Sequence, residues 1–237
     1  GGCALIMWLG ESITRNGIGN GISMILFAGI ISRIPVTATI MFQHFQQRGA
    51  NLVVMPLAAL TMLLMIAYIV WMDNAEQRIP VQYAKRVVGR KMYGGQNSYI
   101  PIKVNMSGVL PVIFASSILS IPPTINMFVQ ADEKSNLYKW LFAPFEQDHW
   151  FYAIIYFILI IFFAYFYSAI QYNPVEMANN LRKNGGTVPF VRPGKPTSDY
   201  IQKVLSKIVL LGALLLSVVA LFPILFSQFA DLVGADA

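Results

Sequence analysis

Basic side chains are the residues of this sequence best suited to act on a partner, and they gather in two polar segments, 74–107 and 173–207. Guanidinium and ammonium groups form charge-assisted hydrogen bonds with carboxylates and phosphates. We therefore expect these segments to contact a docking partner or anionic lipid. The cations are Arg78, Lys85, Arg86, Arg90, Lys91 and Lys103 in the first segment, and Arg182, Lys183, Arg192, Lys195, Lys203 and Lys207 in the second.

The other residues with chemical potential form no known type of site. The single Cys3 and the two histidines, His44 and His149, give neither a disulfide framework nor the spacing of metal ligands. The segment Gly10–Gly21 ends in alternating glycines, but no strand precedes it and no Lys follows. A tight turn before a helix starting near Ile18 is expected instead. The sequence also lacks paired aspartates, a Ser-His pair and a HExxH helix. We expect no enzyme, cofactor or metal site.

The composition excludes a soluble domain. Of the 237 residues, 56% are hydrophobic and 12% are charged, whereas about 25% of the residues in soluble domains are charged. Apolar runs of about 17–25 residues predict membrane-spanning helices. Four such runs contain no Lys, Arg, Asp, Glu or His: 52–72, 108–128, 151–172 and 208–229. The sequence therefore predicts an all-α, polytopic membrane helix bundle.

Two further apolar runs lie near the start of the chain. One is placed at about 18–41, with its apolar helix ending near Pro35 and a polar outer loop at 41–51. The other, 1–9, begins without Met inside a hydrophobic run, so we expect the end of another span and hence part of a longer protein. With about five complete spans, 1–237 is expected to be a fragment of a single membrane domain.

The distribution of Lys and Arg predicts the orientation of the spans, because basic residues are retained on the cytoplasmic side. Two spans separate the two basic segments, so both segments emerge on one side. With Arg15 that side receives thirteen of the 17 Lys and Arg residues. The other side receives Arg33, Arg48, Lys134 and Lys139. The segments 73–107 and 173–207 are therefore expected to be cytoplasmic loops.

The predicted span 108–128 differs from the others in its prolines and small residues. It contains Pro111, the adjacent Ser116 and Ser117, and a Pro122-Pro123 pair. Small residues let helices approach closely, and prolines loosen the backbone of a membrane helix. This pattern favours a helix that moves or breaks contact. In an alternative interpretation, the serine hydroxyls only bond back to the preceding turn.

The second basic segment combines a short helix with a stiff tip. EMANNLRKNGG predicts a helix ended by the Gly185-Gly186 pair, and the prolines of TVPFVRPGKPT stiffen an extended tip around Arg192. The last helix is expected to be entered from Asp199. One interpretation is a docking surface on a rigid scaffold. The other is a solvated loop that fixes topology and touches anionic lipid.

Three long strings resemble the bacterial SecY family, the central subunit of the Sec protein-conducting channel. They are GESITRNGIGNGISMILFAGI, then QRIPVQYAKR with VVGRKMYGGQNSYIPIKVNMSGVLPVIFASSI, and YNPVEMANNLRKNGGTVPFVRPGKPT. The resemblance covers most of the chain and implies the end of the fourth through the ninth membrane helix. It also implies SecE and SecG as membrane partners, docking of the SecA ATPase or the ribosome on the two basic loops, and signal sequences and nascent polypeptides as clients.

The resemblance also implies roles for particular residues. The hydrophobic pore ring falls on Ile22, Leu26 and Ile113, with Leu26 in place of the more usual isoleucine. The lateral gate, through which membrane segments leave for lipid, falls on the helix with Pro111, Ser116, Ser117 and Ile121. The docking residues are Arg78, Lys85, Arg86, Arg90, Lys91, Arg182, Lys183, Arg192 and Lys195. The plug, the first three helices and the last helix of the family have no counterpart here, so this chain does not enclose a pore by itself.

The resemblance thus implies a pore-forming subunit in the bacterial plasma membrane. It would pass unfolded secretory proteins across and membrane segments laterally into lipid. The alternatives are a small-solute transporter and a membrane scaffold with basic docking loops. An ion-coupled transporter is expected to carry ionisable residues in mid-membrane, and the four clear spans have none. The residues alone favour a passive conduit or scaffold whose energy comes from a partner.

Overall fold

The computed structural model describes residues 1–46, 51–84, 86–93, 97–105, 108–130, 135–146 and 149–233. It divides into two compact units, residues 1–61 and residues 62–232. Helix α4 (Asn51–Asn74) contributes its first turns to one unit and the remainder to the other. Each unit is described by itself below.

The first unit begins with two helices, α1 (Gly2–Asn16) and α2 (Gly21–Ile31), which approach closely through glycine. A Cβ atom on Gly21 would lie 2.0 Å from the carbonyl oxygen of Gly10, so this crossing requires glycine. The Thr14 hydroxyl donates to that carbonyl and accepts from the Gly21 amide, at 2.9 Å each. Asn20 caps α2 by accepting from the amides of Ile22 and Ser23.

Two boundaries predicted in this unit were wrong. The expected turn at 10–21 is helical as far as Asn16, and the next helix begins at Gly21 instead of near Ile18. The expected outer loop at 41–51 is helical as far as Gln46, because α3 (Ile34–Gln46) continues the span after a break at residues 32–33. Pro35 lies in the first turn of α3, where a missing N–H costs no helical hydrogen bond. It therefore starts a helix here.

The membrane helices of the second unit are α5 (Leu110–Leu119), α6 (Ile121–Val129), α8 (Trp150–Gln171) and most of α10 (Lys195–Val233), together with the rest of α4. Short α7 (Asn136–Leu141) and the 3₁₀ turn Ala143–Phe145 follow α6. Five helical stretches of the described chain are long and apolar enough to cross a membrane: 21–46, 52–74, 110–129, 150–183 and 195–229. The predicted number of complete spans is thereby confirmed.

Small and aliphatic side chains hold α5, α8 and α10 together. Ala115 of α5, Ile160 of α8 and Leu216 of α10 are fully or almost fully buried in one cluster. Beside it, the Phe114 ring stacks on the ring of Phe163 with 5.6 Å between centroids. Offset aromatic pairs of this kind add about 0.5–1.5 kcal/mol to the burial of their surface. The helix with the proline and serine pattern is thus packed against α8 along its first half.

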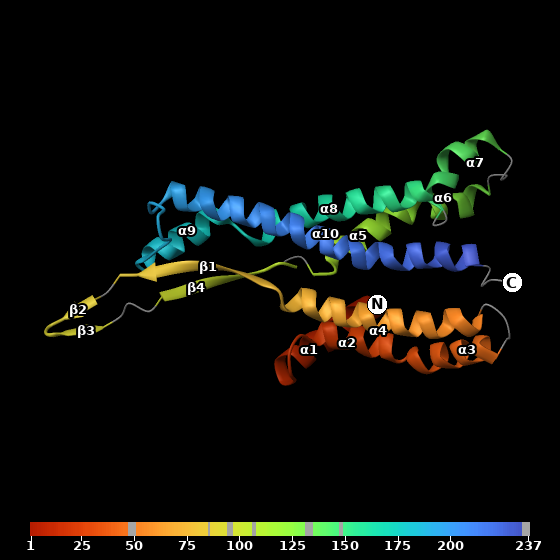
Figure 1. Cartoon of the computed structure of the whole chain (residues 1–237), viewed down its shortest axis with the longest axis horizontal. Helices are drawn as coiled ribbons and strands as arrows, with labels where there is room; N and C mark the ends of the chain where they lie inside the picture. Colours follow the sequence, from red (N-terminus) through yellow and green to blue (C-terminus); the bar gives the residue numbers. More distant parts are fainter. Residues whose placement is uncertain are drawn as a thin grey trace. The chain divides into compact units, whose positions relative to one another are not determined.

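Between the end of α4 and the start of α5 the chain forms an antiparallel sheet (Figure 1). Its long strands, β1 (Glu76–Tyr83) and β4 (Asn97–Lys103), pair from Glu76↔Lys103 to Gln82↔Asn97. A smaller hairpin of β2 (Arg86–Val88) and β3 (Lys91–Tyr93) lies between them in sequence. The helical bundle is confirmed as the fold class, but residues 73–107, which were expected to form a loop, contain these strands. Ile79 and Val81 are the buried residues of β1 and alternate with the exposed Arg78, Pro80 and Gln82, which is the period-two signal of a strand.

The second basic segment is also more ordered than a loop. It contains α9 (Pro174–Lys183), the short strand β5 (Gly186–Thr187) and the first turns of α10, which begins at Lys195 instead of Asp199. The predicted short helix with a glycine end is confirmed, since Gly185 follows α9 at a φ of 72°. Thirteen residues separate Lys195 from the predicted membrane entry at 208, which is about 20 Å of helix at about 1.5 Å per residue.

Candidate functional site

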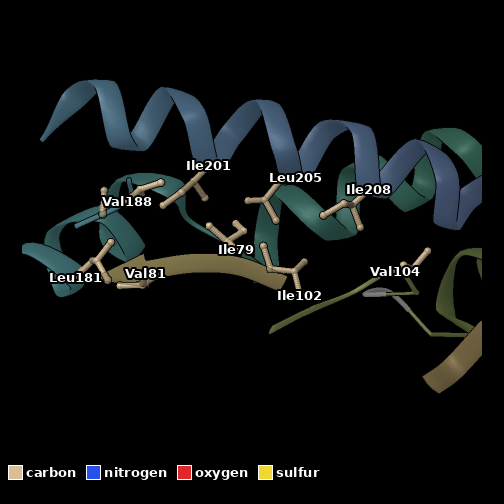
Figure 2. Close-up of a cluster of buried hydrophobic side chains, with 10 residues drawn as sticks. Ile79, Val81, Ile102, Val104, Leu181, Val188, Ile201, Leu205 and Ile208 are labelled. Atoms are coloured by element: carbon tan, nitrogen blue, oxygen red, sulfur yellow. The ribbon is translucent and has the colours of Figure 1, made fainter. Parts of the chain in front are cut away.

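One hydrophobic core joins the two basic segments into a single folded body, hereafter the basic body, which comprises the sheet β4-β1-β5, α9 and the first turns of α10. Ile79 points from β1 toward α10, and Val81 lies beside Leu181 of α9 (Figure 2); Ile201 of α10 belongs to the same buried cluster. Ile102 and Ile201 are completely buried. Burial of each such aliphatic side chain contributes about 1.5–3 kcal/mol to the free energy of folding. The core therefore fixes the cations of both segments on one scaffold.

Strand pairing connects the segments directly. Gln82 of β1 is opposite Thr187 of β5, and Tyr83 is opposite Gly186. The amide of Ala84 also donates to the carbonyl of Gly185 at 3.3 Å. A Cβ on Gly186 would lie 2.9 Å from side-chain atoms of Leu181 and Tyr83, so glycine lets the strand approach α9. The two segments are paired with each other, which agrees with the prediction from the parity of the spans that both emerge on one side.

The described cations of the two basic segments are exposed. Arg90 and Lys91 lie on the smaller hairpin, and the other exposed cations are Arg78, Lys103, Arg182, Lys183, Arg192, Lys195, Lys203 and Lys207. Arg78 is stacked over Tyr99 at 4.4 Å from the ring centroid, and its Nε donates to Glu76 at 3.0 Å. Among these described cations, Arg78 is the one with an ion pair. The others have charge available for a partner. Lys85 and the side chain of Arg86 lie outside the described residues.

The span that contains the proline pair is divided into two helices at Ser120. Helix α5 ends at Leu119 and α6 begins at Ile121, because Pro122 and Pro123 have no N–H to continue the hydrogen-bond ladder. The hydroxyls of Ser116 and Ser117 donate to the carbonyl of Ile113 at 2.9 and 2.7 Å. The hydrogen bonds of both serines are therefore those of the alternative interpretation, in which the hydroxyls bond back to the preceding turn.

The residues assigned to the pore ring by resemblance are exposed apolar side chains in this chain. Ile22 and Leu26 lie four residues apart on α2, hence on nearly one face, and Ile113 lies on α5. Their exposed fractions are 50%, 61% and 49%. The first two belong to one unit and the third to the other, so the ring assignment stays a prediction. Pro111 is buried in the first turn of α5, and Ile121 is exposed at the start of α6.

A joint that the sequence did not predict connects the basic body to the membrane helices. The amide of Val104 donates to the carbonyl of Ala75 at 3.1 Å, and the Asn105 side chain donates to Asp73 at 3.1 Å. Helix α10 contacts this joint at Gly212, where an added Cβ would lie 2.0 Å from the Val104 carbonyl oxygen. A lone glycine in the apolar run of the last span was the available signal.

These features define a multi-pass membrane protein with a basic body fixed to one end of its helices. A family model described as SecY matches residues 1–236. The protein translocase subunit SecY of Halalkalibacterium halodurans is 45% identical over 98% of this chain and 54% of its own length. The subunit of the same name from Mycobacterium leprae is 44% identical, over 98% of this chain and 53% of its own length. The chain belongs to the SecY family.

Solved structures show the same fold at lower sequence identity. A structure described as that of a protein conducting channel aligns with 99% of this chain and 64% of its own, with a TM-score of 0.61 and 16% identity. Another, whose description concerns the plug domain of the SecY protein, aligns with a TM-score of 0.58 and 17% identity over 99% of this chain and 65% of its own. The chain spans about half the length of the curated relatives it matches.

Proposed function

We propose that this chain is part of the pore-forming subunit of a Sec protein-conducting channel in the bacterial plasma membrane. Unfolded secretory proteins pass across through the pore, and membrane segments leave laterally into lipid. The observation that carries this proposal is the family match along residues 1–236. The geometry agrees, since the four clear spans lack ionisable side chains while both basic segments fold into one exposed body.

In this proposal the chain supplies a scaffold and a seal, and the energy comes from a partner. The exposed side chains of Ile22, Leu26 and Ile113 contribute to an apolar constriction that excludes water and blocks ions by dewetting. The break between α5 and α6 lets the gate helix, with Pro111, Ser116, Ser117 and Ile121, part from its neighbours. Apolar side chains hold a passing polypeptide weakly, so it is not trapped.

The proposed partners follow from the charge and position of the basic body. Its cations face the cytoplasm and receive the SecA ATPase or the ribosome, with anionic lipid near the membrane surface. SecE and SecG are the proposed membrane partners, and signal sequences and nascent chains are the clients. A small-solute transporter is disfavoured because its coupling ion would require ionisable residues in mid-membrane. A scaffold with docking loops would bind the same partners without transport.

Arg192→Glu tests the docking part of this proposal. Arg192 is exposed at the tip of the basic body, so the reversal is expected to change the free energy of unfolding by no more than about 0.5 kcal/mol. A charge-assisted contact with SecA would become repulsive, and SecA-driven precursor transport into proteoliposomes should fall at least about tenfold. The matched control is Lys203→Glu, an exposed cation on α10 outside the proposed docking set. Equal transport by both variants and the wild type would show that the tip serves only topology.

A further inference from the structure

The tip of the basic body is a tight turn with an unusual residue at its bend. The amide of Val191 donates to the carbonyl of Val188 at 3.2 Å, closing a turn over Pro189 and Phe190. Phe190 has a φ of 65°. Proline at the second position and a positive φ at the third are the features of a type II turn, where glycine or asparagine normally occupies the third position. A phenylalanine there holds a backbone conformation that its Cβ disfavours.

The ring of Phe190 is also fully exposed. Its relative accessibility is 108%, the highest among the large hydrophobic side chains of the described chain. The residues on both sides are held by the body: Val188 is buried in the core (Figure 2), and Val191 packs against it. Farther along, the Thr197 hydroxyl donates to the carbonyl of Arg192 at 2.7 Å. The turn is therefore anchored at both ends, and the ring projects from a rigid base.

Neither feature helps the chain to fold. A strained backbone and an exposed aromatic ring both cost free energy, and such sites persist where function requires them. We infer that Phe190 is an aromatic anchor that inserts into an apolar pocket on the soluble protein docking against the basic body. The exposed cations Arg192 and Lys195 follow within five residues, so carboxylates are expected at the rim of that pocket. The inference rests on the proposed docking function and deepens it.

A protein pocket fits these observations better than lipid does. Lys195, close to the turn, is separated by about 20 Å of helix from the predicted membrane entry at residue 208. A ring at that height does not reach the lipid headgroups while α10 spans the membrane. RNA is also disfavoured, since stacking proteins present their rings beside a groove of cations that follows the nucleic-acid backbone. Here one ring stands on a turn with two cations.

The test compares four forms of the intact protein in nanodiscs: wild type, Phe190→Gly, Phe190→Asn and Phe190→Trp. Glycine and asparagine suit a positive φ, so the melting temperatures of these two variants should equal or exceed that of the wild type. Their affinity for purified SecA should nevertheless fall about tenfold or more, because buried aromatic anchors dominate interface energies. Phe190→Trp retains a ring and should bind within about threefold of the wild type.

The outcomes separate this inference from the proposed function. Wild-type SecA affinity in Phe190→Gly, together with lost affinity in Arg192→Glu, would overturn the anchor and leave the docking function standing. Wild-type affinity in both variants would overturn docking on this tip as well. If Phe190→Gly lowered the SecA affinity only in nanodiscs that contain anionic lipid, the ring would be a lipid contact. If it lowered only the affinity for ribosomes, with a steep salt dependence, the ring would be an RNA contact. Either result would overturn the inference.

Discussion

Ile113→Asn is expected to raise the resting ion conductance of the intact protein in planar bilayers at least about tenfold, because a polar side chain lets water wet an apolar constriction. Ile113 is half-exposed on α5, two residues beyond the buried Pro111. An amide at this position offers hydrogen bonds to water where the isoleucine offers none. The same change should relax the demand for a strong signal sequence in transport assays.

The control for this prediction is Ile118→Asn. Ile118 lies on the same helix with an exposed fraction of 40%. It follows Ile113 by five residues and therefore lies on a different face of the helix. The Ile118→Asn substitution should leave the resting ion conductance unchanged. Equal conductance in the wild type and both variants would place Ile113 in ordinary helix packing, and equal increases in both would indicate a general leak.

Gly212→Val is expected to have the largest effect on stability. The added Cβ would lie 2.0 Å from the carbonyl oxygen of Val104, an atom of the backbone that cannot turn aside. Helix α10 must then separate from the joint that connects β4 to α5, at a cost of about 1–3 kcal/mol or more. A melting temperature several degrees lower and faster proteolysis of the basic body should follow.

Gly29→Val provides the matched control for this substitution. Gly29 is also helical and lies in an apolar span, yet an added Cβ there meets nothing within 4 Å. Both variants carry the same change in helix propensity, so the difference between their melting temperatures isolates the contact with Val104. Equal losses in the two variants would contradict the importance of this joint.

The membrane helices were predictable because their signal is local. A long apolar run free of ionisable residues is expected to form a helix, because lipid offers no hydrogen-bond partner for unpaired backbone N–H and C=O groups. The strands β1 and β4 were harder, because their buried residues alternate with charges and prolines such as Pro80 and Pro101. Their pairing also depends on α9 and α10, which lie about a hundred residues farther along the chain.

The cations of the candidate site were predictable, but their arrangement was not. Loop composition located Arg182 and Arg192, and the family resemblance made them docking candidates, whereas the shared core that fixes them with Arg78 emerges from the fold. The strain at Phe190 is a backbone angle, and the closeness of Gly212 to Val104 is a contact between distant segments. A lone glycine can mark Gly212 as a point of close approach, but no sequence pattern gives its contact partner or the φ of Phe190.

The most direct test of the channel proposal is site-specific photo-crosslinking from Ile113 during arrested transport of a secretory precursor. The account predicts a crosslink from Ile113 to the precursor that appears only with SecA and ATP. The comparison position is Ile158, an exposed residue of α8 with an accessibility of 57%, where lipid should be labelled instead. A precursor that never crosslinks to Ile113, or crosslinks equally at Ile158, would contradict the claim that this chain lines a protein-conducting pore.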